Sequence, residues 1–548
     1  MLGGLLILSI SAKAPSPRAI ELAVPGQFLI DATDLREAEG LSTKLHAEFG
    51  TAVKSRQSAN STVNFVEIVE QSSAGGWRNL NDLLADLEKV EGVETIQPDY
   101  YRYVAPVPKK QIGSGSSWHL AALELYRVHQ LSKRGQSVTV AVIDDAVMIE
   151  HTGLRGRIWE NPREIAGNGL DDDQNGYIDD VNGYNFGNDV ADPSPRGTCL
   201  ESGHGTHVAG IIGATENRSK GVEGIASNVK IMPLAIGVSD RGCSLTSSSL
   251  IQAIYYAIGN GAQIINMRLG GPVGAEIERK ALEYAHRKGV LVIIAAGNDW
   301  LSNDKSDVPS GSTIQAVFKL HNGQVVHRGF APAFPSSFGM SNPAIISVAN
   351  LAQSRNEEEV LYTGSATWDK RAVRARIENG RLIYDLLEDF HQPIGSSYGE
   401  ESVDLAAPGT QILSLVPGPN GSSGYRKMTG TSMASPVVAG AAALLWSNYP
   451  DASHLEIKSR LLNSAKSNPD LLRKIASSGQ LNLLAAICHE NDDRIAGCTN
   501  TTAPGKPISK PEPRPEERQL ENASSPNDWL REGESSQRES GIGGVPWR

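Results

Sequence analysis

The sequence predicts an α/β protein with a mostly parallel central sheet. Between about residues 118 and 484, short apolar runs rich in β-branched residues alternate with longer runs of helical spacing. The strand-like runs are Val138–Ile143, Val229–Ala235, Gln263–Asn266 and Val290–Ala295, and the helix-like runs are Ser248–Ile258 and Glu276–Arg287. The 548-residue chain is 40% hydrophobic, which is enough to bury a large core. Functional side chains in such sheets lie at the carboxyl ends of the strands.

A smaller α+β unit is expected ahead of this region, over about residues 25–104. Gln27–Ile30, Val63–Val69 and Val93–Pro98 have the pattern of strands, and Leu80–Leu87 has helical apolar spacing. Residues 105–117 are rich in Pro, Lys, Gly and Ser, so they are expected to form a linker.

The two ends of the chain differ from both units. Residues 1–14 contain a short apolar stretch and end in Ala12-Lys13-Ala14, which predicts a secretory signal that lacks its basic region. A mis-assigned start or a buried strand is the alternative. Residues 485–548 hold a short Cys-containing segment, followed by a tail from Thr499 that is expected to be disordered and dispensable for activity.

Charge and cysteine content exclude several classes of protein. The net charge is −11, which argues against a nucleic-acid-binding protein. No apolar run reaches about 18 residues, so no transmembrane helix is expected. Four cysteines allow three pairings, and in an oxidising compartment Cys199–Cys243 with Cys488–Cys498 is the favoured one. We expect a secreted or periplasmic monomer.

Three separate motifs supply a candidate nucleophilic serine and the two residues that would activate it. Ser432 lies in Gly-Thr-Ser-Met-Ala-Ser-Pro at the start of a long apolar helix, where the helix dipole favours developing negative charge. His204 begins a second apolar helix and can act as the base. Asp144 ends a core strand and can hold the imidazole in the right tautomer. His207, three residues into the same helix, is expected to be structural.

These motifs identify the chain as a member of the subtilisin-like serine proteases, the subtilases. The matching segments are AVIDD around Asp144, GHGTHVAG around His204 and GTSMASP around Ser432, in the order that the family shows. Further matching segments begin at Ile265, Phe334 and Asp404. The resemblance covers residues 118–484 and implies a three-layer fold around the parallel sheet.

The resemblance also implies further site residues. The Asn298 side chain would complete the oxyanion hole with the Ser432 N–H. Segments that line the substrate strand would include Arg268, Leu269, Gly270, Gly271, Ala296, Gly297 and Asp299. Arg268 replaces a small residue, and Asp299 is an acidic position at the mouth of the primary pocket, so the sequence leaves the specificity open.

The N-terminal unit resembles the inhibitory propeptide of these proteases, which has a ferredoxin-like α+β fold. Its segment Val93–Tyr100 resembles the stretch that precedes the tail entering the cleft. The resemblance implies a precursor that removes its own propeptide by cleavage within residues 105–117. An unrelated ferredoxin-like domain is the alternative.

A dense run of carboxylates, residues 171–180, predicts a structural Ca²⁺ site. Counting from the first ligand, the spacing places oxygen ligands at Asp171, Asp173, Asn175, the Tyr177 carbonyl and Asp179. A solvated acidic loop is the alternative. The tighter calcium site of the family is expected to be absent, because His151-Thr152-Gly153 lacks its carboxylate and Arg218 and Lys220 occupy ligand positions.

Two insertions follow Asn298, at about residues 303–333 and 352–393. Each has an Asn-Gly turn between alternating apolar residues, which predicts two β-hairpins that pair with each other; two unrelated surface loops are the alternative.

The sequence therefore predicts a serine endopeptidase that acts on protein or peptide substrates through an acyl-enzyme and needs no cofactor for catalysis. The first alternative is a catalytically inactive binding or scaffold protein with the same fold. A serine esterase is a second alternative, but its G-x-S-x-G motif and Ser, Asp, His order are absent from the sequence.

Overall fold

The computed structural model describes the two folded regions and leaves out both ends of the chain. The described residues are 23–49, 53–58, 61–68, 86–102, 117–200, 202–217, 219–240, 243–267, 269–270, 274–298, 303–304, 316–319, 325–329, 333–353, 359–361, 373–378, 381–386, 396–488 and 498. The expected signal segment, most of the expected helix at 80–87, the linker 105–116 and the tail 499–548 lie outside them. The chain divides into two compact parts, residues 1–504 and 505–548, and the described residues all belong to the first part.

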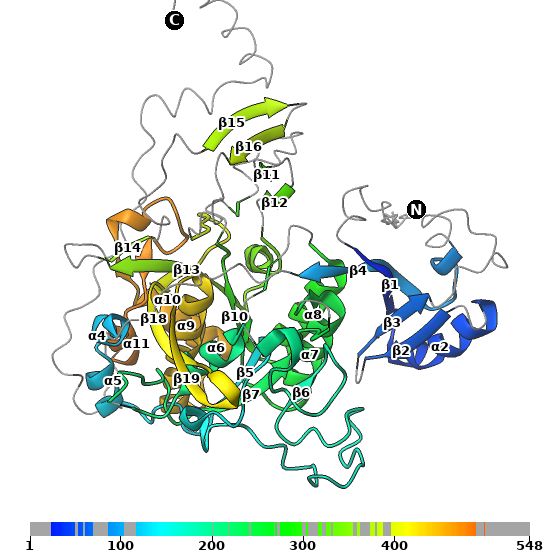
Figure 1. The fold of residues 1–548 in the computed structure, drawn as a ribbon, viewed down its shortest axis with the longest axis horizontal. Coiled ribbons are helices and arrows are strands. Elements are labelled where there is room, and N and C mark those ends of the chain that lie inside the picture. The colour runs from blue at the N-terminus through cyan, green and yellow to red at the C-terminus, as the bar shows by residue number, and fades with distance from the viewer. Residues whose placement is uncertain are drawn as a thin grey trace, which may run out of the picture. The chain divides into compact units, whose positions relative to one another are not determined.

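A central sheet positions the functional residues (Figure 1). Its spatial order is β20-β21-β17-β13-β10-β9-β5-β7-β6, and all neighbours from β21 to β6 pair in parallel. These strands are β5 (Thr139–Asp144), β6 (Tyr184–Asn185), β7 (Lys230–Ala235), β9 (Ile264–Met267), β10 (Leu291–Ala295), β13 (Ile345–Gln353), β17 (Leu405–Pro408), β20 (Lys466–Ser467) and β21 (Gly479–Gln480). β14 (Glu359–Leu361) pairs antiparallel with β13.

Helices cover both faces of this sheet, because alternate side chains of each strand enter different cores. Val140 and Val142 of β5 pack in one core with α6 (His204–Gly213) and α9 (Thr431–Asn448). Ala141 and Ile143 pack in a second core with α7 (Ser247–Gly259) and α8 (Glu276–Arg287). The smaller helices α5 (Leu125–Leu131), α10 (His454–Asn463) and α11 (Leu483–Ile487) add residues to the first core. The predicted α/β fold with a parallel sheet is confirmed.

The N-terminal unit is an antiparallel sheet with a core of its own on one face. It consists of β1 (Ala23–Ala32), α2 (Leu35–Phe49), β2 (Val53–Gln57), β3 (Val63–Ile68) and β4 (Val93–Arg102). The strand order β2-β3-β1-β4 is that of a ferredoxin-like sheet. Leu41 and Leu45 of α2 pack on Ile30, and α2 and β2 were not expected from the sequence. At its far end β4 pairs with β8 (Leu245–Thr246) of the larger region.

The two insertions form a four-stranded sheet of their own. β11 (Ala316–Lys319) pairs antiparallel with β12 (Val325–Gly329), and β15 (Val373–Glu378) pairs antiparallel with β16 (Arg381–Leu386). β11 and β16 then pair in parallel, so the order is β12-β11-β16-β15. Strands from two separate insertions therefore form one sheet, with core strand β13 between them in the chain.

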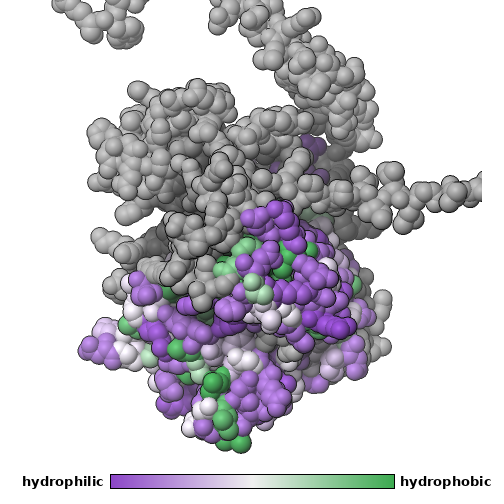
Figure 2. Space-filling view, turned by 90° about the vertical axis from the view of Figure 1, so that its right-hand side faces the viewer, coloured by the Kyte–Doolittle hydropathy of each residue, from purple (hydrophilic) through white to green (hydrophobic). Residues whose placement is uncertain are grey.

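Two disulfides and the surface complete the fold. The bridges are Cys199–Cys243 and Cys488–Cys498, which confirms the favoured pairing. Hydrophilic residues cover most of the described part of the face in Figure 2, and apolar residues form separate groups between them. Among the described residues, no helix is both long enough and apolar enough to cross a membrane.

Candidate active site

Asp144 lies at the carboxyl end of β5, where the sheet changes the direction in which strands are added. β7 lies on one side of β5 and β9 on the other, and such a point is the usual place for a site in an open α/β sheet. The Asp144 side chain is 2% exposed. One of its oxygens, Oδ1, also accepts the backbone N–H of Asp145 at 2.8 Å, so the carboxylate is held in one orientation.

His204 is the first residue of α6 and contacts this carboxylate directly. Its Nδ1 lies 2.9 and 3.0 Å from the two Asp144 oxygens, and its side chain is also 2% exposed. The next residue, Gly205, passes so close to the end of β5 that a Cβ there would lie 2.3 Å from the Ala146 carbonyl oxygen. A glycine is therefore required for α6 to begin at this point.

A second carboxylate, that of Asp145, fixes the start of α6 and was not singled out from the sequence. Asp145 Oδ1 accepts the backbone N–H of Ala146 at 2.7 Å and that of Gly205 at 2.8 Å. Burial raises the pKa of Asp145, and the neighbouring Asp144 charge raises it further. The doubled aspartate at positions 144–145 was the available signal in the sequence.

Ser432 is the second residue of α9, at the end where backbone N–H groups lack partners within the helix. The residue is 2% exposed, and α9 packs against α6. Asn298, three residues after β10, accepts hydrogen bonds through Oδ1 from the N–H of Thr431 at 2.9 Å and from its hydroxyl at 3.0 Å. The chain thus brings Asn298 to the start of the helix that carries Ser432.

His207 makes the contacts of a structural histidine. Its Nε2 lies 3.0 Å from the Ile412 carbonyl oxygen and 2.9 Å from that of Arg426, so it links α6 to β18 (Ile412–Pro417) and β19 (Ser423–Met428). Burial lowers the pKa of His207 to about 3, and the residue is therefore a neutral donor.

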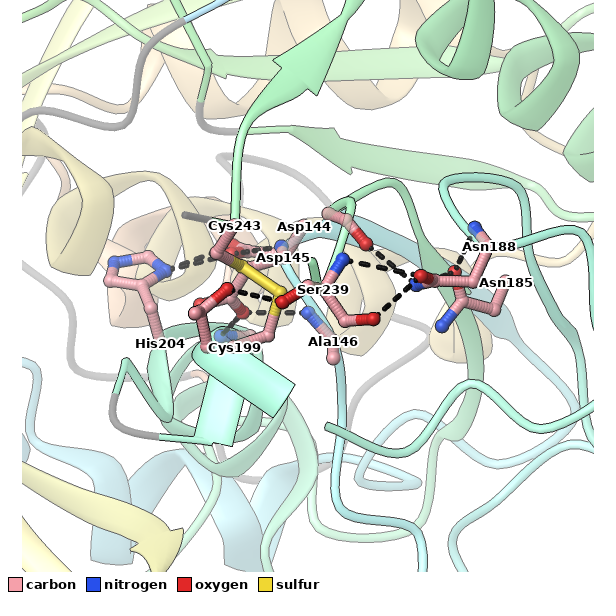
Figure 3. Close-up of a disulfide and its surroundings, with 12 residues drawn as sticks. Asp144, Asp145, Ala146, Asn185, Asn188, Cys199, His204, Ser239 and Cys243 are labelled. Atoms are coloured by element: carbon pink, nitrogen blue, oxygen red, sulfur yellow. Dashed lines mark hydrogen bonds and ion pairs between the residues drawn. A yellow bond between two sulfur atoms is a disulfide. The ribbon is translucent and has the colours of Figure 1, made fainter. Parts of the chain in front are cut away.

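The Cys199–Cys243 bridge lies beside the Asp144–His204 pair (Figure 3). Cys199 is five residues before His204, and Cys243 is two residues before β8. A Cβ on Gly237 would lie 2.8 Å from both sulfur atoms and 2.9 Å from the Asp145 carbonyl oxygen. The bridge therefore ties the segment before α6 to the segment before β8.

The residues expected along the substrate strand are described only in part. Leu269 is 3% exposed and packs in the second core, and Gly270 is partly exposed beside it. Ala296 is buried, and the N–H of Gly297 is donated to the Thr431 hydroxyl at 3.3 Å. Arg268, Gly271 and Asp299 lie outside the described residues.

The acidic loop folds mostly onto its own backbone. Asp171 accepts the N–H groups of Asn175 and Gly176 through its two oxygens, and the Asn175 side chain accepts that of Tyr177. Asp179 points to the other end of the loop, where its oxygens accept the N–H groups of residues 167–169 at 2.8–3.1 Å.

A cluster of three carboxylates lies at the base of this loop. Each of Glu164, Asp173 and Asp180 offers an oxygen, and the three oxygens lie within 4.8 Å of one another. Burial, with a contribution from the neighbouring carboxylates, raises the pKa of Glu164 and of Asp180. Asp173 was expected as a ligand, whereas Glu164 and Asp180 were not.

The segment of the expected missing calcium site is also described in part. His151 is buried, and its Nδ1 accepts the N–H of Gly153 at 3.0 Å while Nε2 lies 3.0 Å from the Gly424 carbonyl oxygen. The N–H of Lys220 is donated to the Asn217 carbonyl, and Arg218 lies outside the described residues.

Comparisons with known proteins agree with this geometry. The family model described as the Subtilase family matches residues 135–484, which is more than half of the chain. The chain is 30% identical over 362 residues to subtilisin-like protease 1 of Plasmodium vivax, an alignment that covers 66% of this chain and 49% of that protein. It is 27% identical over 442 residues to the thermophilic serine proteinase of Bacillus sp. strain AK1, with coverage of 81% and 82%.

Among solved structures, the chain is similar to fervidolysin from Fervidobacterium pennivorans, described as a keratinolytic enzyme related to subtilisin. The TM-score is 0.57 at 21% identity, over 85% of this chain and 61% of that one. This similarity is one of fold. The chain spans about half of the length of the Plasmodium relatives that it matches.

Proposed function

Because the chain belongs to the subtilase family, we propose that it is a serine endopeptidase that hydrolyses peptide bonds through Asp144, His204 and Ser432. The observation that carries the proposal is the pair of contacts between His204 Nδ1 and Asp144, at 2.9 and 3.0 Å. The two side chains come from positions 60 residues apart and are buried together, and α6, which begins with His204, packs against the helix that carries Ser432.

In the proposed reaction His204 moves a proton at its second ring nitrogen. It takes the hydroxyl proton of Ser432 as the oxygen forms a bond to the substrate carbonyl carbon, and Asp144 stabilises the resulting imidazolium. His204 then gives this proton to the leaving amine as the peptide C–N bond breaks. In the second half a water molecule loses a proton to His204 and attacks the acyl carbon. The ester bond to Ser432 then breaks, and His204 returns the proton to the serine oxygen.

Asn298 would stabilise the negative oxygen that forms in each half of the reaction. Its Oδ1 is already engaged by Thr431, so the Nδ2 group is left to donate elsewhere. Together with the N–H of Ser432 it would form an oxyanion hole, which acts only when charge develops on the substrate oxygen.

Labelling with a fluorophosphonate tests this proposal against the inactive alternative. The full chain should be labelled, and the Ser432→Ala variant should not. A matched Ser435→Ala variant removes a hydroxyl one turn away on the same helix and should be labelled like the natural chain. A binding or scaffold protein with the same fold would resist labelling in all three forms.

We also propose that the N-terminal unit is an intramolecular inhibitor, removed within residues 105–117. Two contacts from β4 support this role. Asp99 Oδ1 accepts the N–H of Ser248 at the start of α7, and Gln97 Oε1 accepts that of Ile277 at the start of α8, at 2.9 and 3.1 Å. Lys280 of α8 also pairs with Asp31 of β1 at 2.6 Å.

Self-processing predicts that the Ser432→Ala precursor keeps its N-terminal unit, because the same site would cut the linker. The measurement is the mass of the purified chain over time. A Ser432→Ala precursor that still matures when purified alone would contradict self-processing and leave the peptidase proposal intact.

Calcium binding at the acidic loop is the proposed stabilising feature. Glu164, Asp173 and Asp180 fit a hard cation, since they offer several oxygens within a small space and Glu164 Oε2 has no hydrogen-bond partner among the described residues. Bound Ca²⁺ would neutralise these carboxylates and hold the loop between β5 and α6. It would take no part in the reaction.

We propose that the mature protein is secreted or periplasmic. All four cysteines form disulfides, so no free cysteine is left among the described residues. Because disulfides persist in oxidising compartments, this pairing supports a secreted protein.

A further inference from the structure

β4 extends beyond its own sheet and adds a strand to the edge of the candidate active site. Tyr101 pairs with Thr246 and Arg102 with Leu245, in antiparallel register. β8 is the last strand of this sheet, and Cys243, just before it, is bridged to the segment that leads into His204. An extended peptide that pairs with β8 therefore passes along the rim of the site.

Arg102 ends β4 and places its guanidinium in a buried site under α8. Its Nε donates to Glu278 Oε1 at 2.8 Å, and a terminal nitrogen lies 2.6 Å from the same oxygen. Both side chains are fully buried, at 0% exposed. The Ser247 hydroxyl also donates to Glu278 Oε1, at 2.6 Å, while Oε2 has no hydrogen-bond partner among the described residues.

A buried carboxylate of this kind requires a cation. Removing one member of a buried ion pair is strongly unfavourable, because the other charge stays in a poorly solvated site. Here the cation belongs to the N-terminal unit, which leaves after maturation if the proposed function holds. Glu278 and Ser247 belong to α8 and α7 and remain with the enzyme.

We propose that Glu278 is a specificity-determining residue that selects an arginine in the substrate. A substrate strand that replaces β4 on β8 would bring one side chain to the place of Arg102, by the same main-chain pairing. Arginine fits best, since two of its nitrogens reach one carboxylate oxygen. Leucine would leave Glu278 with the Ser247 hydroxyl but without a cation, and glutamate would be repelled. This inference rests on the proposed endopeptidase function.

The N-terminal unit itself fixes where this arginine should stand. The mass of the released N-terminal unit gives the number of residues between Arg102 and the bond that is cut. A peptide library digested by the mature natural enzyme should show arginine enriched at that same distance before the cut, on the order of a hundredfold over leucine. No enrichment, or enrichment at another distance, would overturn the inference.

Variants of Glu278 then test the residue. Glu278→Gln should reduce the ratio of kcat/KM for the arginine and leucine peptides to within a few-fold, and Glu278→Arg should invert the preference toward glutamate. Glu276→Gln removes a half-exposed carboxylate from the same turn of α8 and should keep the natural ratio. If the Glu278 variants do not mature, the library result on the natural enzyme decides alone.

The outcomes separate this inference from the proposed function. A chain that cuts no peptide and takes no fluorophosphonate label overturns both. A chain that is labelled and cuts peptides, but with no preference at this position, overturns the assignment of Glu278 alone.

Discussion

Two groups of carboxylates, a buried one at the end of β5 and a partly buried one at the base of the acidic loop, differ in how their charge is balanced. Asp144 contacts an imidazole, and Asp145 accepts two backbone N–H groups at the start of α6. Glu164, Asp173 and Asp180 instead lie within 4.8 Å of one another, with the Arg163 guanidinium 3.0 Å from Asp173. Both groups accept hydrogen bonds from the chain itself, and we propose that the second group also binds a cation from solution.

The largest effect is expected from the first group. Asp144→Asn keeps the shape of the side chain but favours the wrong tautomer of His204, so kcat should fall about 10⁴-fold. Steady-state kinetics on a peptide substrate, with circular dichroism to verify folding, measures this. A fall of less than tenfold would contradict the role of Asp144.

Removal of the Asn298 amide should have the next largest effect. Asn298→Ala should lower kcat about 10²–10³-fold with little change in KM, because the donor acts on charge that develops in the transition state. Asn298 Oδ1 also holds Thr431, so the melting temperature of the variant is measured in parallel. An effect on KM alone would mean that Asn298 binds substrate without stabilising the oxyanion.

Calcium at the acidic loop should change the stability of the protein and should take no part in catalysis. Calcium at a hundredfold excess over Kd should stabilise the natural chain by about 2.7 kcal/mol. Glu164→Gln with Asp180→Asn should remove this gain, whereas Asp172→Asn, in the same loop, should keep it. Loss of the gain in Asp171→Asn with Asp179→Asn alone would instead favour the ligands expected from the sequence.

The calcium effect should also depend on pH. Burial raises the pKa of Glu164 and Asp180, and Ca²⁺ binds their ionised forms. The stabilisation by calcium should therefore be largest at neutral pH and fade as pH falls through these raised pKa values. Thermal melts with calcium and with chelator, across acidic to neutral pH, give the difference directly.

A third kind of buried carboxylate, Asp99, should give the smallest effect. Burial at the start of α7 raises the pKa of Asp99 from 3.8 to about 6. The Asp99 carboxyl therefore binds a proton more tightly when the N-terminal unit is docked on α7 than when that unit is detached. Docking should weaken as pH rises between about 4 and 6 and then stay constant. Hydrogen exchange of β4 and β8 in the Ser432→Ala chain, corrected for intrinsic exchange, measures this.

Asp99→Asn is the matched control for that measurement, since its side-chain oxygen can still accept the Ser248 N–H. Its exchange protection should be independent of pH over the same interval. A natural chain whose protection rises with pH would contradict the assigned sign.

The places of Asp144, His204 and Ser432 in the fold agree with the sequence prediction, whereas their catalytic roles stay a prediction. Asp144 ends β5, and His204 and Ser432 lie in the first turns of α6 and α9, so their places follow from local pattern. The Cys199–Cys243 pairing was also within reach, since four cysteines allow few choices.

Sequence patterns did not predict the contacts that join distant segments of the chain. Glu164 approaches Asp180 because the intervening loop folds back on its own N–H groups, which no periodicity records. Arg102 and Glu278 are 176 residues apart and meet because β4 leaves its own sheet to pair with β8. In the sequence alone, neither Arg102 nor Glu278 differs from an ordinary charged residue of the surface.

The sheet built from both insertions makes them a single module for engineering. β11 and β16 pair with each other although core strand β13 lies between them in the chain. Deleting either insertion alone would expose the backbone edge of the remaining hairpin, which favours aggregation. A minimal version of this protein should therefore lose both insertions together, and a graft of the sheet onto another scaffold would need two junctions on either side of a core strand.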